Sequence, residues 1–381
     1  MKAGEMTKGS DIMTKKKKIL LCCLAALLVI LLVAGVIVYQ KIPHALNYPI
    51  DKLEPIAHQS VSVVSEGDDM IMLQKKDDGA FRIMMFTDQH LDGNNKTGYK
   101  TVDRMVQCIR KEQPDLVLIG GDNVTSGLNK KRANQYAQIF EQLGVYWGGV
   151  LGNHEGDNPY SVSRSEMVDI FSSYDHCVMR RGVSGIDGDC NYVIRLLGKD
   201  GRQMQTIFCL DTFDEISDEI AASHTLFDKR SPYDGAHENQ VEWYRQTAAE
   251  LKEIDGSYKS ILLQHIPLHA YDKAIETETF LYGDKREDIC STVYDNGLFD
   301  AIKETGVTQA VFCGHDHLNN FGVEYEGILL SYIEPSGYGA YGLGRRGAPE
   351  SEWLQGYTLL EVLPDGTLSQ SQVRYAEVFG D

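Results

Sequence analysis

Apolar residues along this 381-residue chain gather in short runs, and most runs end at a glycine or at a cluster of polar residues. Runs bounded in this way predict β-strands, whereas apolar positions three or four residues apart predict helices. The predicted strands lie at residues 70–75, 81–87, 116–119, 145–151, 192–197, 205–210, 260–264, 308–313, 328–333 and 357–362. The predicted helices lie at residues 99–112, 130–143 and 238–253.

The alternation of strands and helices predicts one α/β domain. Repeats of this kind are typical of a mostly parallel sheet that carries ligands at the carboxyl ends of its strands. The runs at 192–197 and 205–210 are expected to be adjacent strands. The runs at 70–75 and 81–87 flank Asp77-Asp78-Gly79, a turn sequence that predicts a hairpin. We expect two layers of strands, arranged as a sandwich flanked by helices.

The N-terminal region contains an apolar run, residues 19–38, without a single charged residue. It is long enough to cross a bilayer as a helix. Lys15 to Lys18 precede it, and the positive-inside rule then places the N-terminus in the cytoplasm. A cleaved signal peptide is the alternative, but the run exceeds a usual signal core and no A-x-A-type site closes it. The sequence therefore predicts a single-pass membrane protein with its folded domain outside the cytoplasm.

This interpretation divides the chain into four parts. Residues 1–18 form a basic cytoplasmic tail, and residues 19–39 form the transmembrane signal anchor. Residues 40–59 contain Pro43, Pro49 and Pro55, a spacing that predicts a semi-extended stalk. The folded domain is expected to occupy residues 60–381.

The charge distribution restricts the class of partner. The formal net charge is −18, yet the first 41 residues carry seven lysines against two acidic residues, so the remainder carries −23. Nucleic acid and anionic membrane surfaces are disfavoured as partners of such an acidic domain, because phosphate groups require Lys and Arg for neutralisation. Any phosphorylated ligand would then have to be attracted locally, by a few positive charges.

Candidate chemistry lies in five polar patches, each at the end of an apolar run or in a glycine-flanked turn. Their residues are Asp88, His90, Asp122, Asn153, His154, His265, His315 and His317. Taken singly, each patch is better explained as a surface turn, a helix cap or a solvated loop. Taken together, carboxylate, imidazole and amide ligands in this order suit two divalent cations such as Mn, Fe or Zn. A pair of such ions is suited to displacement at phosphorus.

The spacing within the patches suggests individual roles. In an extended segment, Asp88 and His90 point the same way and reach one ion. Asp122 follows two glycines that permit a sharp turn, and its two carboxylate oxygens suit a bridge between both ions. His154 is expected to point away from the ions and to serve acid chemistry. His315 and His317 are expected to serve one ion each.

The sequence resembles the calcineurin-like metallophosphoesterase superfamily over about residues 70–345. The motifs FRIMMFTDQH, PDLVLIGGDN, VLGNHE, HIPL, VFCGHDHLNNF and GYGAYGLGRRGA are similar to its purple-acid-phosphatase-like branch, which includes fungal cell-cycle-regulator phosphatases and plant relatives. The resemblance implies an α/β fold in which a β-sandwich of two mixed sheets is flanked by helices in four layers, here preceded by one transmembrane helix. Thr125 replaces the tyrosine of true purple acid phosphatases, so a purple tyrosinate–iron site is not expected.

Carried over by position, the resemblance implies two overlapping ligand sets. They are Asp88, His90, Asp122 and His317 around one metal, and Asp122, Asn153, His265 and His315 around the other. His154 matches the family's acid or transition-state-stabilising histidine. Its ring would be oriented by Glu155, Asp157 or a backbone carbonyl.

The expected activity is hydrolysis of phosphomonoesters or phosphodiesters, on a phosphorylated small molecule or another phosphoester. A water shared by two cations is acidified toward neutrality, and the resulting hydroxide attacks phosphorus in line. Arg345 and Arg346 are candidates to grip the phosphate, with solvated arginines in a tight turn as the alternative. The competing hypothesis is a non-catalytic, metal-containing ectodomain that binds a partner.

Overall fold

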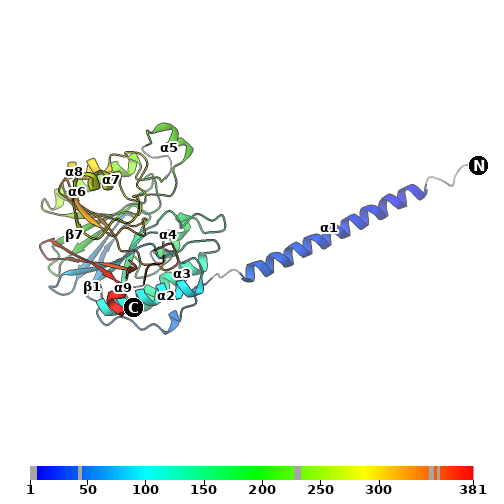
Figure 1. Ribbon diagram of the computed structural model, residues 1–381, viewed down its shortest axis with the longest axis horizontal. Helices are drawn as coiled ribbons and strands as arrows, with labels where there is room; N and C mark the ends of the chain where they lie inside the picture. Colours follow the sequence, from blue (N-terminus) through cyan, green and yellow to red (C-terminus); the bar gives the residue numbers. More distant parts are fainter. Residues whose placement is uncertain (1–6, 42–44, 227–232, 343–346, 350–351, 381) are drawn as a thin grey trace, which may run out of the picture. The chain divides into compact units, whose positions relative to one another are not determined.

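The computed structural model describes residues 7–41, 45–226, 233–342, 347–349 and 352–380, and the chain divides into two units, Met1–Pro43 and His44–Asp381. The first unit holds helix α1 (Thr7–Lys41), shown in Figure 1. Its segment Lys15–Ile37 is long and apolar enough to span a membrane, as the sequence predicts. A signal sequence has the same properties, so this finding leaves both sequence alternatives open.

The second unit contains two sheets. Within its described residues, one sheet has nine strands in the order β1-β2-β6-β7-β8-β10-β12-β11-β9, and the other has five in the order β14-β13-β3-β4-β5. Both sheets contain parallel and antiparallel pairs, which confirms the predicted pair of mixed sheets. The nine strands are β1 (Val61–Glu66), β2 (Met70–Lys75), β6 (Tyr192–Leu197), β7 (Gln203–Cys209), β8 (Ser260–Leu263), β10 (Thr308–Cys313), β12 (Ile328–Tyr332), β11 (Gly322–Tyr325) and β9 (Phe280–Tyr282). The five are β14 (Leu368–Arg374), β13 (Gly356–Val362), β3 (Phe81–Phe86), β4 (Leu116–Gly120) and β5 (Tyr146–Val150).

The two sheets share a hydrophobic core, because alternate residues of a strand point to opposite faces. In β8, Ile261 and Leu263 belong to the same buried cluster as the residues of β3 and β4. Leu262 belongs instead to a second cluster, on the outer face of the nine-stranded sheet. The unit therefore has a sandwich at its centre, as predicted.

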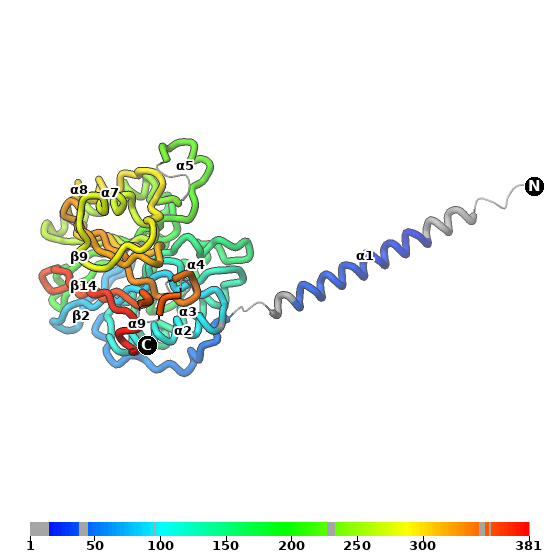
Figure 2. The backbone as a smooth tube through the Cα atoms, viewed as in Figure 1, coloured from blue at the N-terminus to red at the C-terminus, as the bar shows by residue number. Residues whose placement is uncertain are grey.

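Helices cover both outer faces of the sandwich. The second cluster is completed by α6 (Glu238–Ile254), α7 (His269–Thr277) and α8 (Leu298–Thr305). The first cluster includes α2 (Asn95–Glu112), α3 (Lys130–Leu143) and α4 (Arg164–Ser172). Figures 1 and 2 show α7 and α8 at one end of this unit, and α2 and α3 at the other. Two short helices, α5 (Asp218–Ser223) and α9 (Tyr375–Phe379), complete the set of described α-helices.

The predicted hairpin between residues 70–75 and 81–87 is wrong. β2 pairs with β1 and β6, whereas β3 pairs with β4 and β13 in the other sheet. Almost every residue of β3 is buried, so this strand occupies the middle of its sheet and has neighbours on both sides. The turn at Asp77 carries the chain from one sheet to the other. The predicted pairing of β6 with β7 is confirmed, and it is antiparallel.

The prediction of a stalk at residues 40–59 also needs correction, because its described part packs on the folded unit. Leu46, Ile50 and Ile56 are buried in the first hydrophobic cluster. The backbone N–H of Ile56 donates to the carbonyl of Leu143 at 2.8 Å. Burial of each such side chain stabilises the folded unit by about 1.5–3 kcal/mol. A solvated stalk would not gain this stabilisation. The folded unit therefore begins well before residue 60.

Candidate metal centre

The candidate ligands lie just beyond five strands, three in one sheet and two in the other. Asp88, Asp122 and Asn153 follow β3, β4 and β5, which run parallel to one another. His265 follows β8, and the pair His315 and His317 follows β10, which is parallel to β8. Since parallel strands present their carboxyl ends at one edge, each sheet delivers its ligands to a single place.

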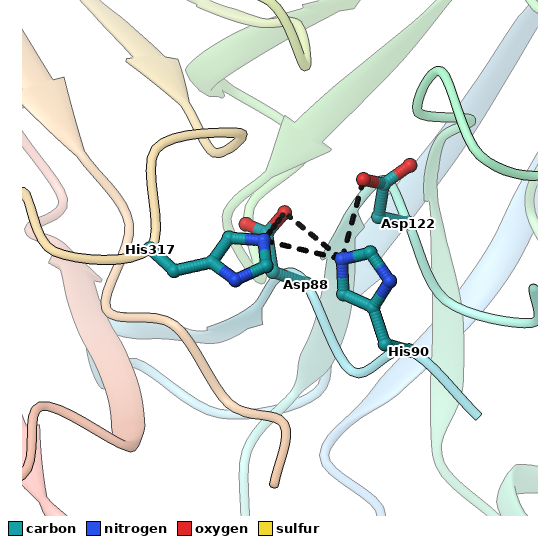
Figure 3. A group of neighbouring side chains, drawn as sticks. All are labelled: Asp88, His90, Asp122 and His317. Atoms are coloured by element: carbon teal, nitrogen blue, oxygen red, sulfur yellow. Dashed lines mark hydrogen bonds and ion pairs between the residues drawn. The ribbon is translucent and has the colours of Figure 1, made fainter. Parts of the chain in front are cut away.

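One group of ligand atoms combines four residues from three of these loops (Figure 3). Asp88, His90, Asp122 and His317 each offer an atom within 4.8 Å of the others. The Nε2 atom of His90 lies 3.1 Å from Nε2 of His317 and 3.4 Å from Oδ2 of Asp122. The spacing suits donors that surround one cation.

A second group shares Asp122 with the first. Its other members are His265 and His315, again within 4.8 Å of one another. Nε2 of His265 lies 3.4 Å from Oδ2 of Asp122 and 3.2 Å from Oδ1 of Asn153. The structure therefore brings all seven predicted ligands together and places Asp122 in both groups.

The donor set fits a bound cation. Oδ2 of Asp88 accepts hydrogen bonds from the hydroxyl of Thr87 (2.8 Å) and the backbone N–H of His315 (3.1 Å). Oδ1 of Asp88 is buried and has no hydrogen-bond partner among the described residues. It lies 3.2 Å from Nε2 of His317. A buried acceptor beside an imidazole nitrogen favours a cation between them.

Backbone carbonyls orient two of the histidines. Nδ1 of His265 donates to the carbonyl of Gly120 at 2.7 Å, and Nδ1 of His317 lies 3.2 Å from the carbonyl of Tyr341. A hydrogen bond at Nδ1 fixes the tautomer and leaves the Nε2 lone pair for a metal. Burial disfavours the charged form of His265, yet the carboxylates of Asp122 and Asp88 raise its pKa to about 9. The site therefore attracts positive charge.

His154 belongs to neither ligand group but lies beside them. Its side chain is 42% exposed, and its Nε2 atom is 4.0 Å from Oδ2 of Asp122. Nδ1 forms a short ion pair with Asp157, which identifies the partner that orients the ring. Burial lowers the pKa of His154, but Asp122 and Asp157 outweigh that effect and raise it. These two carboxylates therefore favour the protonated form of the imidazole.

Glu155 does not orient His154. Its carboxylate is fully buried and accepts backbone N–H groups from Gly152 (2.9 Å), Asp122 (3.2 Å) and Asn123 (2.6 Å). It also accepts the side-chain amide of Asn123 at 3.0 Å. Burial and the neighbouring Asp122 raise the pKa of Glu155. This residue joins the loops after β4 and β5, a role that its place in the sequence did not reveal.

The backbone at the ligands corrects one geometric prediction. Asp88, His90, Asp122 and His315 have φ values of 55°, 44°, 54° and 80°. They occupy the left-handed region rather than an extended segment, at a cost of about 1–3 kcal/mol each. Asp88 and His90 therefore converge through a tight turn, not through strand alternation. Gly121, at φ 99°, is required, since a Cβ there would lie 2.4 Å from Nδ1 of His265.

Two tyrosines pack against ligand histidines, and these contacts were not predicted. The ring of Tyr341 stacks on His317 with centroids 4.2 Å apart, and the ring of Tyr233 meets His315 edge-on at 4.3 Å. Contacts at such sequence separations depend on tertiary packing and leave no local signal. Arg345 and Arg346, the predicted phosphate-gripping pair, lie outside the described residues.

The comparisons with known proteins agree with this geometry. A model of the calcineurin-like phosphoesterase family matches residues 81–319, the span that contains every candidate ligand. "Probable inactive purple acid phosphatase 14" of Arabidopsis thaliana is 26% identical over 303 residues, which cover 70% of this chain and 72% of that protein. "Phosphatase DCR2" of Saccharomyces cerevisiae is 23% identical over 283 residues, covering 65% of this chain and 46% of that protein.

Among solved structures, a dimetal phosphatase from Danio rerio is similar, with a TM-score of 0.47 and 15% identity. The similarity covers 75% of this chain and 93% of that one. The family model matches well over half of the chain, and its span includes both ligand groups. This chain therefore belongs to the calcineurin-like phosphoesterase family.

Proposed function

We propose that the chain is a binuclear metal-dependent phosphoesterase that hydrolyses phosphomonoesters or phosphodiesters. The single observation that supports it best is the position of Asp122, whose carboxylate belongs to both ligand groups. Two divalent ions, Mn, Fe or Zn, held on either side of it would acidify a water and neutralise charge on the phosphoryl oxygens. Membership of the family supports phosphoester hydrolysis at the level of reaction class.

The chain's own residues then supply binding, orientation and a proton. Asp88, His90, Asp122 and His317 would hold one ion, and Asp122, Asn153, His265 and His315 would hold the other. His154, kept in place by Asp157, is half exposed beside Asp122 and is the group proposed to protonate the leaving alkoxide. Asp122 is proposed to act in catalysis through the shared ions. Arg345 and Arg346 remain a prediction for phosphate binding.

A second function is supported by the names of the plant relatives, which mark them as probably inactive. Under this alternative, the unit keeps its ions for structure and binds a partner. The pairing of His154 with Asp157 favours catalysis, because a purely structural metal site needs no oriented histidine outside its ligand set.

Location is the third part of the proposal. We propose that α1 anchors the chain in a membrane with the N-terminus in the cytoplasm and the catalytic unit outside. Lys15 to Lys18 before the apolar segment support this orientation. The acidic unit is not expected to bind nucleic acid. Protease treatment of intact cells that produce the chain should degrade the catalytic unit, and its complete protection would contradict the orientation.

One experiment tests the reaction and distinguishes the two functions. The purified chain is analysed for metals and assayed with p-nitrophenyl phosphate and bis-p-nitrophenyl phosphate, with and without a chelator. We expect two ions per chain and hydrolysis that the chelator abolishes and Mn²⁺ restores. The ratio of the two activities separates monoester from diester preference. Two bound ions without activity on either ester would favour the partner-binding alternative.

A further inference from the structure

Tyr341 contacts His317 in three ways. The two rings are nearly parallel, with an interplanar angle of 11° and centroids 4.2 Å apart. The Nδ1 atom of His317 lies 3.2 Å from the backbone carbonyl of Tyr341, and the backbone N–H of His317 points to the tyrosine hydroxyl at 3.3 Å. One residue therefore restrains the imidazole at its face, at its distal nitrogen and at its backbone.

A second chain segment holds Tyr341 itself. Its hydroxyl donates to Oε1 of Glu287 at 2.9 Å, and the same oxygen accepts the backbone N–H of Leu318 at 2.7 Å. The backbone N–H groups of Arg286 and Glu287 both donate to Oδ1 of Asn319. The segments around Glu287, His317 and Tyr341 therefore form one hydrogen-bonded unit at the edge of the ligand groups.

The arrangement is specific to one of the two groups. His317 belongs to the group with Asp88 and His90, and not to the group with His265. The equivalent orienting bond of His265 comes from Gly120, inside the core. Tyr341, by contrast, is 40% exposed. The orientation of His317 depends on a surface residue, whereas the orientation of His265 depends on buried backbone.

We propose that Tyr341 is a positioning residue that sets the affinity of the ion held by Asp88, His90 and His317, and that it leaves the other ion largely unaffected. The inference rests on the proposed function, since it assumes that two ions bind. Partners that orient a ligand histidine from outside typically change metal affinity 10–100-fold when removed. Loss of the ring should free His317 to turn away from the ligand group.

The test compares the wild-type chain with Tyr341→Ala, Tyr341→Leu and Tyr341→Phe, each loaded with Mn²⁺. All three variants keep the backbone carbonyl, and Tyr341→Phe also keeps the stacked ring and loses only the hydroxyl that bonds to Glu287, so it should weaken metal binding less than Tyr341→Ala. Tyr341→Leu keeps apolar bulk and guards against a folding defect in Tyr341→Ala. Tyr233→Ala is the matched control, because it removes a tyrosine from beside His315 in the other group. Metal content is measured by elemental analysis during titration with a chelator.

We expect Tyr341→Ala and Tyr341→Leu to bind one of the two ions roughly 10-fold or more weakly. Anomalous diffraction from manganese-loaded crystals should show the lost occupancy beside His317. Unchanged affinity in both variants would overturn the inference, and so would equal weakening of both ions or the same effect from Tyr233→Ala. If the wild-type chain binds two ions and is active, the proposed function still holds in each of these outcomes. A wild-type chain that binds no metal would overturn both.

Discussion

The backbone N–H of His154 donates to Oδ1 of Asp122 at 2.8 Å. The residue proposed as the acid thus fixes one oxygen of the carboxylate shared by both ligand groups. The other oxygen, Oδ2, lies 3.4 Å from Nε2 of both His90 and His265. Because the contact comes from the backbone, it survives replacement of the His154 side chain, so metal binding and proton donation can be tested separately.

The first prediction concerns Asp122→Asn. The amide preserves the size of the side chain but removes the negative charge that faces both groups, so we expect metal content to fall from two ions per chain toward none. Activity should fall with it. Elemental analysis after desalting measures the ions. Asp115→Asn is the matched control, since Asp115 is also buried but pairs with Lys75 at 3.0 Å and belongs to neither ligand group. Full metal content in Asp122→Asn would contradict the shared-ligand assignment.

The second prediction concerns His154→Ala. The backbone contact to Asp122 remains, so we expect both ions to stay bound. Turnover of a substrate with a poor leaving group should fall roughly a hundredfold or more, as for loss of a positioned acid. An ester of p-nitrophenol needs less protonation and should be less affected. Equal rate losses on both kinds of ester, or none on the poor leaving group, would remove His154 from the role of acid.

The third prediction concerns Glu155→Gln. The amide has one acceptor oxygen where the carboxylate has two, and its NH₂ group would face N–H donors from the loops after β4 and β5. Buried donors without partners cost about 1–3 kcal/mol, so the free energy of unfolding should fall by that amount. Glu166→Gln is the control, because the side chain of Glu166 is 43% exposed and pairs with Lys130 at the surface. Denaturant unfolding of both variants with the chelator present checks the difference.

Much of the site was predictable because each ligand follows a buried apolar strand. The strands that end before Asp88, Asp122 and His315 were all predicted to within two residues. The residue type that follows a strand can be read directly from the local sequence. The left-handed backbone at His90 was not predictable, since it depends on contacts such as its N–H to the carbonyl of Asp122.

The sequence predicted the positions of the strands better than it predicted their pairing. The segments at β2 and β3 have the composition of a hairpin, yet they separate into different sheets because β3 is buried on both faces. Burial on both faces is a tertiary property that a short apolar run does not specify. The contact between Tyr341 and His317 was missed for a related reason. It spans 24 residues and involves a loop without periodicity.

The fourth prediction is a pH dependence that arises at Glu334. This residue is fully buried after β12, and burial raises the pKa of its carboxyl to about 8, against the lowering effect of the hydrogen bond from Asn320. A folded-state pKa above the unfolded one means that the stabilising effect is present at low pH and is lost as the pH rises toward 8. Glu334→Gln removes the ionisation. We expect the variant to gain stability relative to wild type between pH 5 and 8, by about 1 kcal/mol or more. If the free energies of unfolding of the two proteins change with pH in parallel across that interval, the prediction is refuted.

The last prediction concerns the segment before β1. Ile56 is 5% exposed and its N–H bonds to Leu143 at the end of α3, so it belongs to the core and not to a stalk. Ile56→Ala should lower the free energy of unfolding by about 2–5 kcal/mol, as for other large-to-small core substitutions. Val64→Ala is the control, because Val64 lies on β1 with 48% of its surface exposed and should change stability by less than about 0.5 kcal/mol. Equal and small effects in the two variants would return residues 46–56 to the role of a linker.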